Sequence, residues 1–203
     1  MRYVRHTSLA LCLALPALGL AAAPSSNQQA CIAAVAAHTT ALATAQSRQM
    51  MACAAIAAGP IDPACLAADA HGAIAAETAA LRTAVIESCQ EAPEFGTDPR
   101  PVPVATAAGT VHVKGLATDL LGDGTVPASL LGADGGRCRR AVARGAGRLL
   151  TNTLNDAVAC QRAALRTGVN DATPLAACVL ALPTGNTART ASKLAGRVRR
   201  GCR

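Results

Sequence analysis

The chain carries the stretch CIAAVAAHTTALATAQSRQMMAC at residues 31–53 and a related stretch, CRRAVARGAGRLLTNTLNDAVAC, at residues 138–160. Each begins and ends with a cysteine, so both cysteine intervals are 22 residues. A second pair of cysteines follows each stretch at an interval of 24 residues: Cys65 and Cys89, then Cys178 and Cys202. Only the gap between the pairs differs, at 12 residues in the first copy and 18 in the second. These matching intervals predict an internal repeat.

Each copy is predicted to form an antiparallel helical hairpin. The first arm, residues 31–53, contains no Gly or Pro and is rich in Ala, the strongest helix former. Helical arms of 22 and 24 residues rise about 33 and 36 Å, so their lengths match. Gly59-Pro60 and Asp62-Pro63 mark the turn in the first copy. The turn of the second copy is marked by Gly168, Asn170-Asp171 and Thr173-Pro174.

A hairpin places its first and fourth cysteines at the open end and its second and third at the turn. The predicted bridges are Cys31–Cys89, Cys53–Cys65, Cys138–Cys202 and Cys160–Cys178. The last cysteine of each copy is expected just beyond its helix end. In the second copy, Pro183-Thr184-Gly185 predicts a break, after which Asn186 or Thr187 caps a new helix.

The first 21 residues have the features of a secretion signal: Arg2 and Arg5, an apolar run from Leu9 to Leu20, then small residues. Its removal leaves eight cysteines, an even number typical of an oxidising compartment. We therefore expect a secreted or periplasmic bacterial protein without a transmembrane anchor. The expected organisation is a signal peptide at 1–21, a first four-cysteine hairpin at 22–90, a linker at 91–136 and a second, basic hairpin at 137–203.

The segment between the hairpins is rich in Pro and Gly. We expect a linker that is partly extended, because such residues interrupt helices. Residues 110–114, TVHVK, alternate as a short strand does. Leucines are expected to tie part of the linker to the hairpins: Leu116, Leu120, Leu121, Leu130 and Leu131.

The sequence predicts neither a metal site nor a cofactor. No two cysteines are two to four residues apart and the histidines are scattered, which disfavours zinc. Asp119, Asp123 and Asp134 lack the spacing of a calcium loop, and turn chemistry explains them better. No nucleophile elbow, phosphate loop or dinucleotide fingerprint is present, so an enzyme is the least supported class.

Charge separates the two copies. Residues 31–89 carry a net charge of −2, whereas residues 138–202 carry ten Arg and one Lys against two Asp, a net charge of +9. The cations follow helical spacing and form the candidate anion-binding set: Arg140, Arg144 and Arg148 on the first arm, with Arg189, Lys193, Arg197 and Arg200 on the second. When the repeats are aligned, most of these cations replace alanines of the first copy.

Two interpretations of this basic face remain open. It is either a solvated helix surface, partly neutralised by acidic linker residues, or a surface that binds lipid headgroups, an acidic polysaccharide or nucleic acid. Arg rather than Lys favours bidentate contacts with phosphate or carboxylate. A specific nucleic-acid site is not expected, because Phe95 is the one aromatic residue beyond the leader and offers no stacking platform.

The pattern of four cysteines in each of two helical hairpins resembles that of secreted bacterial proteins built from long Ala- and Lys-rich cysteine hairpins. In topology it is also similar to the twin-cysteine coiled-coil-helix proteins. The resemblance implies an all-α fold of two disulfide-bridged hairpins and no particular activity. We therefore expect a non-enzymatic structural or binding module, with binding to an anionic surface or polymer through the second hairpin as the alternative; partner and ligand are unknown.

Overall fold

The computed structural model describes residues 23–56, 62–91, 93, 101–121, 133–169, 171–180 and 185–202. All regular structure in these ranges is helical, as the sequence predicts. The helices are α1 (Ser26–Ile56), α2 (Pro63–Ala67), α3 (Ala73–Ser88), α4 (Pro101–Leu121), α5 (Ala133–Arg166), α6 (Thr173–Leu180) and α7 (Gly185–Gly201). The expected signal peptide and the Gly59-Pro60 turn lie outside the described residues.

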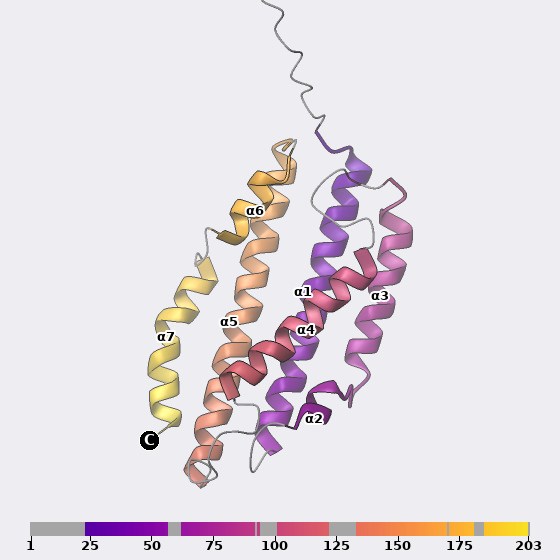
Figure 1. Ribbon diagram of the computed structural model, residues 1–203. Helices are drawn as coiled ribbons and strands as arrows, with labels where there is room; N and C mark the ends of the chain where they lie inside the picture. The colour runs from indigo at the N-terminus through magenta and orange to yellow at the C-terminus, as the bar shows by residue number, and fades with distance from the viewer. Residues whose placement is uncertain are drawn as a thin grey trace, which may run out of the picture.

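Two sets of helices repeat one order, a long helix followed by a short helix and a medium one (Figure 1). We call α1 to α3 the first half and α5 to α7 the second half. In each half the third helix packs on the long one. The disulfides are the four that hairpin geometry predicts, and each stays within its half: Cys31–Cys89, Cys53–Cys65, Cys138–Cys202 and Cys160–Cys178.

In the first half the second arm is divided into α2 and α3, which the sequence did not predict. In the second half it comprises α6 and α7, and Pro183-Thr184 of the predicted break lies outside the described residues. Gly72 (φ 65°) precedes α3 and Gly185 (φ 48°) begins α7, and both adopt the left-handed conformation that favours glycine. Both following helices have their first amides bound by a carboxylate. Asp69 accepts from the amides of Ile74 (3.1 Å) and Ala75 (2.7 Å).

The cap of α7 comes from another helix. Asp156 of α5 accepts a hydrogen bond from the Thr187 amide at 2.8 Å. The sequence expected Asn186 or Thr187 itself to cap this helix. Because the acceptor lies 31 residues away in the chain, the hydrogen bond also fastens the start of α7 to α5.

The segment between the halves contains a 21-residue helix, α4, so the prediction of a strand at residues 110–114 was wrong. Residues 92, 94–100 and 122–132 of the linker, which was predicted to be partly extended, lie outside the described residues. Pro101 and Pro103 lie in the first turn of α4, where proline is compatible with a helix. One stripe at four-residue spacing is buried: Ala105, Gly109, Val113 and Ala117. This stripe attaches the helix to its neighbours. Of the leucines expected to do so, Leu116 is half-buried, and the side chains of the other four lie outside those described.

Gly109 sets the distance between α4 and α1. A Cβ atom there would lie 2.7 Å from Leu42 Cβ and 3.1 Å from the Thr39 carbonyl oxygen. A larger residue would therefore separate the helices. α4 crosses α1 diagonally in Figure 1 and also contacts α3 and α5.

The two halves pack together through α1 and α5, which settles a point that the sequence left open. The helices α1 and α5 run antiparallel in Figure 1. One buried cluster combines Met50 and Cys53 of α1 with Ala117 of α4 and Ala143 of α5. A second cluster joins both halves near the start of α1: Ile32, Leu165 and Leu175.

Candidate anion-binding site

The start of α5 and the end of α7 are brought side by side by close packing and by the Cys138–Cys202 bridge. Gly145 lies directly against the Leu194 side chain, and Gly201 lies against Ala141, with no room for a Cβ atom at either glycine. Small residues thus let the two helices approach closely. Side chains of the two helices can therefore face a common space.

Four arginines line one pocket in this region, two from each helix. Arg144 and Arg148 are one turn apart on α5, and Arg197 and Arg200 are one turn apart on α7. The pocket has a volume of about 310 Å³ and is completed by small residues: Ala141, Gly145 and Gly201. We call it the basic pocket.

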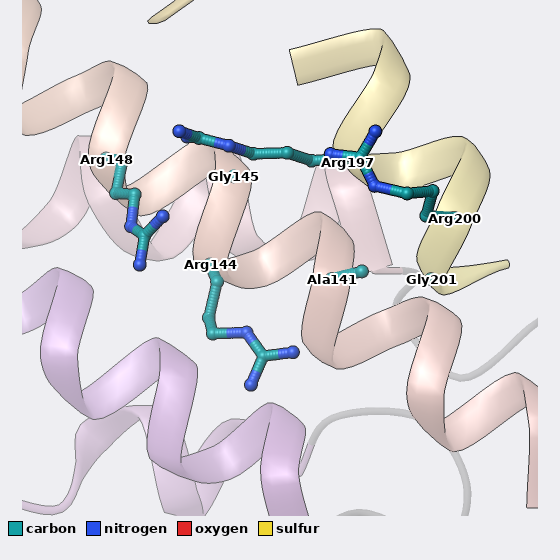
Figure 2. Close-up of a pocket in the computed structure, with 7 residues that line it drawn as sticks. All are labelled: Ala141, Arg144, Gly145, Arg148, Arg197, Arg200 and Gly201. Atoms are coloured by element: carbon teal, nitrogen blue, oxygen red, sulfur yellow. The ribbon is translucent and has the colours of Figure 1, made fainter. Parts of the chain in front are cut away.

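Figure 2 shows how these side chains lie. Arg144 and Arg148 leave α5 toward the α1 side, whereas Arg197 extends from α7 across α5 beside Gly145. Arg197 is half-buried and the other three arginines are exposed. The pocket is thus open to solvent while its rim is cationic on two sides.

No ion pair within the described part of the chain involves these four arginines. One ion pair elsewhere in the described residues joins His38 Nδ1 to Glu77 Oε2 at 3.7 Å, in the first half. Asp156, the carboxylate that caps α7, lies eight residues from Arg148, which is about 12 Å along α5. Of the acidic linker residues expected to neutralise the basic face, Glu91 accepts a hydrogen bond from Ser25 Oγ at 2.8 Å. The other five have side chains outside those described: Glu94, Asp98, Asp119, Asp123 and Asp134. The described carboxylates therefore leave the charge of the basic pocket uncompensated.

The remaining three candidate cations do not line this pocket. Arg189 instead donates to Asn186 Oδ1 at 2.7 Å and to the Gly185 carbonyl at 3.4 Å. It also lies near Asp156, and it therefore acts at the start of α7. Arg140 is half-buried and Lys193 is exposed. The structure thus brings together four of the seven residues that helical spacing selected.

Asp156 is ionised more readily than an ordinary carboxyl. The hydrogen bond from the Thr187 amide is the main cause that holds the pKa of Asp156 below its usual value of 3.8, and the nearby Arg189 charge acts in the same direction. The negative form is therefore the form that binds α7. This contact fixes the other end of the helix that carries Arg197 and Arg200.

Sequence reasoning missed one part of the site and one arginine close to it. The first is the set of glycines, whose signal was the run RGAGR at residues 144–148, where three small residues lie between two cations. The second is Arg48 of the first half, which lies outside the basic pocket and lines two further hollows, the nearer of which shares Arg148 with the pocket. Counting charges by repeat concealed Arg48, because the first half is nearly neutral.

No known family model, curated protein or solved structure matches this chain. Within the described residues, no three metal-ligating side chains gather into a group. None of the described helices has the length and apolar character needed to cross a bilayer. Four disulfides are typical of proteins in an oxidising compartment.

Proposed function

We propose that the protein is an exported, disulfide-bridged helical module that binds phosphate- or carboxylate-bearing ligands through the basic pocket. The observation that carries this proposal is that four arginines, two from α5 and two from α7, line one pocket and form no ion pair with a described carboxylate. Arg guanidinium groups bind both oxyanions in a bidentate manner. A bound anion would also relieve the mutual repulsion of the arginines.

The lining residues favour binding over catalysis. All seven are Ala, Gly or Arg, so among them none offers a nucleophile or a general base. The pocket is also open to solvent, whereas catalytic groups act most strongly in sites that exclude water. We therefore propose a non-enzymatic role.

Export is supported by the leader at residues 1–21 and by the even set of eight further cysteines. We infer that the oxidised protein works in the bacterial periplasm or outside the cell. The correspondence of the two halves, in helix order and in the bridged cysteines, supports a duplicated hairpin as the origin of the chain.

The test is calorimetric titration of the oxidised chain, residues 22–203, with inorganic pyrophosphate. We expect binding at low salt that weakens as the Debye length shortens from about 10 Å at 0.1 M to about 3 Å at 1 M salt. The double variant Arg144→Gln/Arg197→Gln should lower the affinity at least about tenfold, because it removes two charge-assisted contacts.

A matched control removes the same charge elsewhere. Arg162 and Arg166 are exposed on α5 and do not line the pocket. Arg162→Gln/Arg166→Gln should change the affinity by less than about threefold, the effect of surface charge alone. Absence of binding at low salt, or an equal loss in both double variants, would contradict the proposal.

A further inference from the structure

The basic pocket continues into two hollows along α1 and α5. Arg148 lines both the basic pocket and the nearer hollow, which has a volume of about 230 Å³. The nearer hollow shares Thr44, Arg48 and Thr151 with the farther one, of about 390 Å³. Neighbouring spaces thus share lining residues, and we call the three together the groove.

The groove lies away from α4. α4 approaches α1 at Thr39, Leu42 and Ala43, whereas the groove is lined by Thr44 and Arg48, which fall on another side of the same helix. On α5 its lining residues run from Ala141 to Asn155, a rise of about 21 Å. The groove thus extends along α5 rather than forming a single compact pocket.

Polar groups change along the groove. Beyond the four arginines come Arg48 and a series of hydroxyl and amide side chains: Thr40, Thr44, Ser47, Thr151, Asn152 and Asn155. Glu77 is the carboxylate among the residues that line the groove, at the far hollow from the basic pocket. Cations followed by neutral hydrogen-bonding groups match a chain that carries both acidic groups and hydroxyls.

Other polyanions fit this lining less well. Single-stranded nucleic acid depends on aromatic stacking, and none of the lining residues is aromatic. A membrane surface favours apolar side chains next to the cations. The exposed large apolar residues of the described chain, Ile86, Val104 and Val111, lie on α3 and α4 rather than on α5 or α7.

We propose that a linear acidic polysaccharide lies along the groove, with its acidic groups on the basic pocket and on Arg48. This inference rests on the proposed anion binding and extends it, because both halves then contribute to one site. It gives the packing of α1 against α5 a role in recognition. Gly147 preserves this packing, since a Cβ atom there would lie 2.6 Å from Ser47 Oγ.

The experiment measures the affinity of the oxidised chain for galacturonate oligomers of increasing length, with monomeric galacturonate and pyrophosphate as short anions. We expect the affinity to rise with length and to level off once the groove is filled. Arg48→Gln should weaken the binding of long oligomers about three- to tenfold and leave the affinity for pyrophosphate unchanged, since one exposed charge contact is lost. Arg82→Gln is the matched control, because Arg82 is exposed on α3 and does not line the groove.

The outcomes separate the two proposals. If pyrophosphate binds but long oligomers bind no better than monomeric galacturonate, the groove inference is wrong and the proposed anion binding stands. The same holds if Arg48→Gln and Arg82→Gln have equal effects, or if vesicles of phosphatidylglycerol or single-stranded DNA bind more tightly than every oligomer and are insensitive to Arg48→Gln. If neither pyrophosphate nor any oligomer binds, the proposed function itself fails.

Discussion

In the first half of the molecule Gln49 donates to the Cys65 carbonyl at 2.8 Å, whereas at the corresponding position of the second half Asp156 accepts from the Thr187 amide at 2.8 Å. Equivalent positions of the two long helices, α1 and α5, thus form hydrogen bonds to different neighbouring segments. In the first half α1 holds the turn helix α2, where Gln46 also donates to the Leu66 carbonyl at 2.9 Å. In the second half α5 holds α7. An amide at this position donates to a carbonyl of the turn segment, whereas a carboxylate accepts from the first amides of the third helix.

The halves differ more in their solvent-facing side chains than in the arrangement of their helices and bridges. Both have two bridges and a left-handed glycine at the start of the third helix, Gly72 just before α3 and Gly185 as the first residue of α7. By alignment, Ala37, Ala41 and Ala84 of the first half correspond to arginines of the basic pocket. The bridges and a few glycines therefore maintain the arrangement of the helices. Exposed helix positions can then exchange alanine for arginine without changing that arrangement.

The largest expected difference between the halves concerns the bridges that join the two ends of each hairpin, Cys31–Cys89 and Cys138–Cys202. Removing either one, by Cys31→Ser/Cys89→Ser or by Cys138→Ser/Cys202→Ser, should cost about 4 kcal/mol of unfolding free energy by the loop-entropy estimate. The local effect should be greater in the second half, because α7 packs on α5 with four arginines nearby, whereas α3 packs on both α1 and α4. Hydrogen exchange should show α7 losing more protection than α3. Equal losses in α3 and α7 would mean that the bridges, and not the packing, decide local stability.

The role of α4 in supporting the first half can be tested at two glycines of that helix. Gly109→Ala should lower the free energy of unfolding by about 1–3 kcal/mol, because the new Cβ meets Leu42 and the backbone of α1. Gly115→Ala, whose Cβ meets nothing within 4 Å, should raise it by up to about 1 kcal/mol through helix propensity. Chemical denaturation measures both values. A similar sign for both variants would contradict the docking of α4.

The cross-helix cap should make the second half sensitive to acid. Asp156→Ala should cost about 1 kcal/mol near neutral pH, the usual cost of losing a helix cap. Because the folded-state pKa of Asp156 is lowered, its contribution is present above the unfolded value of 3.8 and is lost as the pH falls through the lower folded value. The stability difference between wild type and variant should therefore shrink in acid, as measured by denaturation at several pH values. A difference that stays constant down to strongly acidic pH would show that the carboxylate charge does not matter.

The smallest expected effect concerns the charge of the basic pocket. Arg144→Gln/Arg197→Gln should raise the free energy of unfolding at low salt by about 0.5 kcal/mol, because it removes repulsion between like charges. It should have no effect at 1 M salt. Denaturation curves at both salt concentrations measure this change. The control Arg162→Gln/Arg166→Gln should give a smaller gain. If both pairs behave alike, the four arginines do not repel one another as a cluster.

The sequence was sufficient for the parts of the fold that cysteine spacing and Ala-rich helices define. It predicted all four bridges and the two sets of helices, since the intervals fix where cysteines can meet. It failed at α4, because Pro101, Pro103, Gly109 and Gly115 individually disfavour helix. Their compatibility depends on the first-turn positions of the prolines and on packing against α1, which a local pattern does not contain.

The candidate site was half predictable for a similar reason. Helical spacing selected two basic stripes, one on each arm. It did not indicate which members converge, since that depends on the contact of Gly145 with Leu194 and on the register between α5 and α7. Helical spacing also could not indicate that Arg48 lies close to the site. Their proximity depends on the packing of α1 on α5, which brings together residues about 100 positions apart in the chain.

Peptide mapping of the unreduced protein tests most directly whether the two halves share one separately bridged frame. After tryptic digestion, we predict that peptide 49–82 carries an internal Cys53–Cys65 bridge and that peptide 149–162 is joined to peptide 167–189 through Cys160 and Cys178. Every remaining bridge should likewise stay within its half. A disulfide-linked pair that joins residues 31–89 to residues 138–202 would contradict the account.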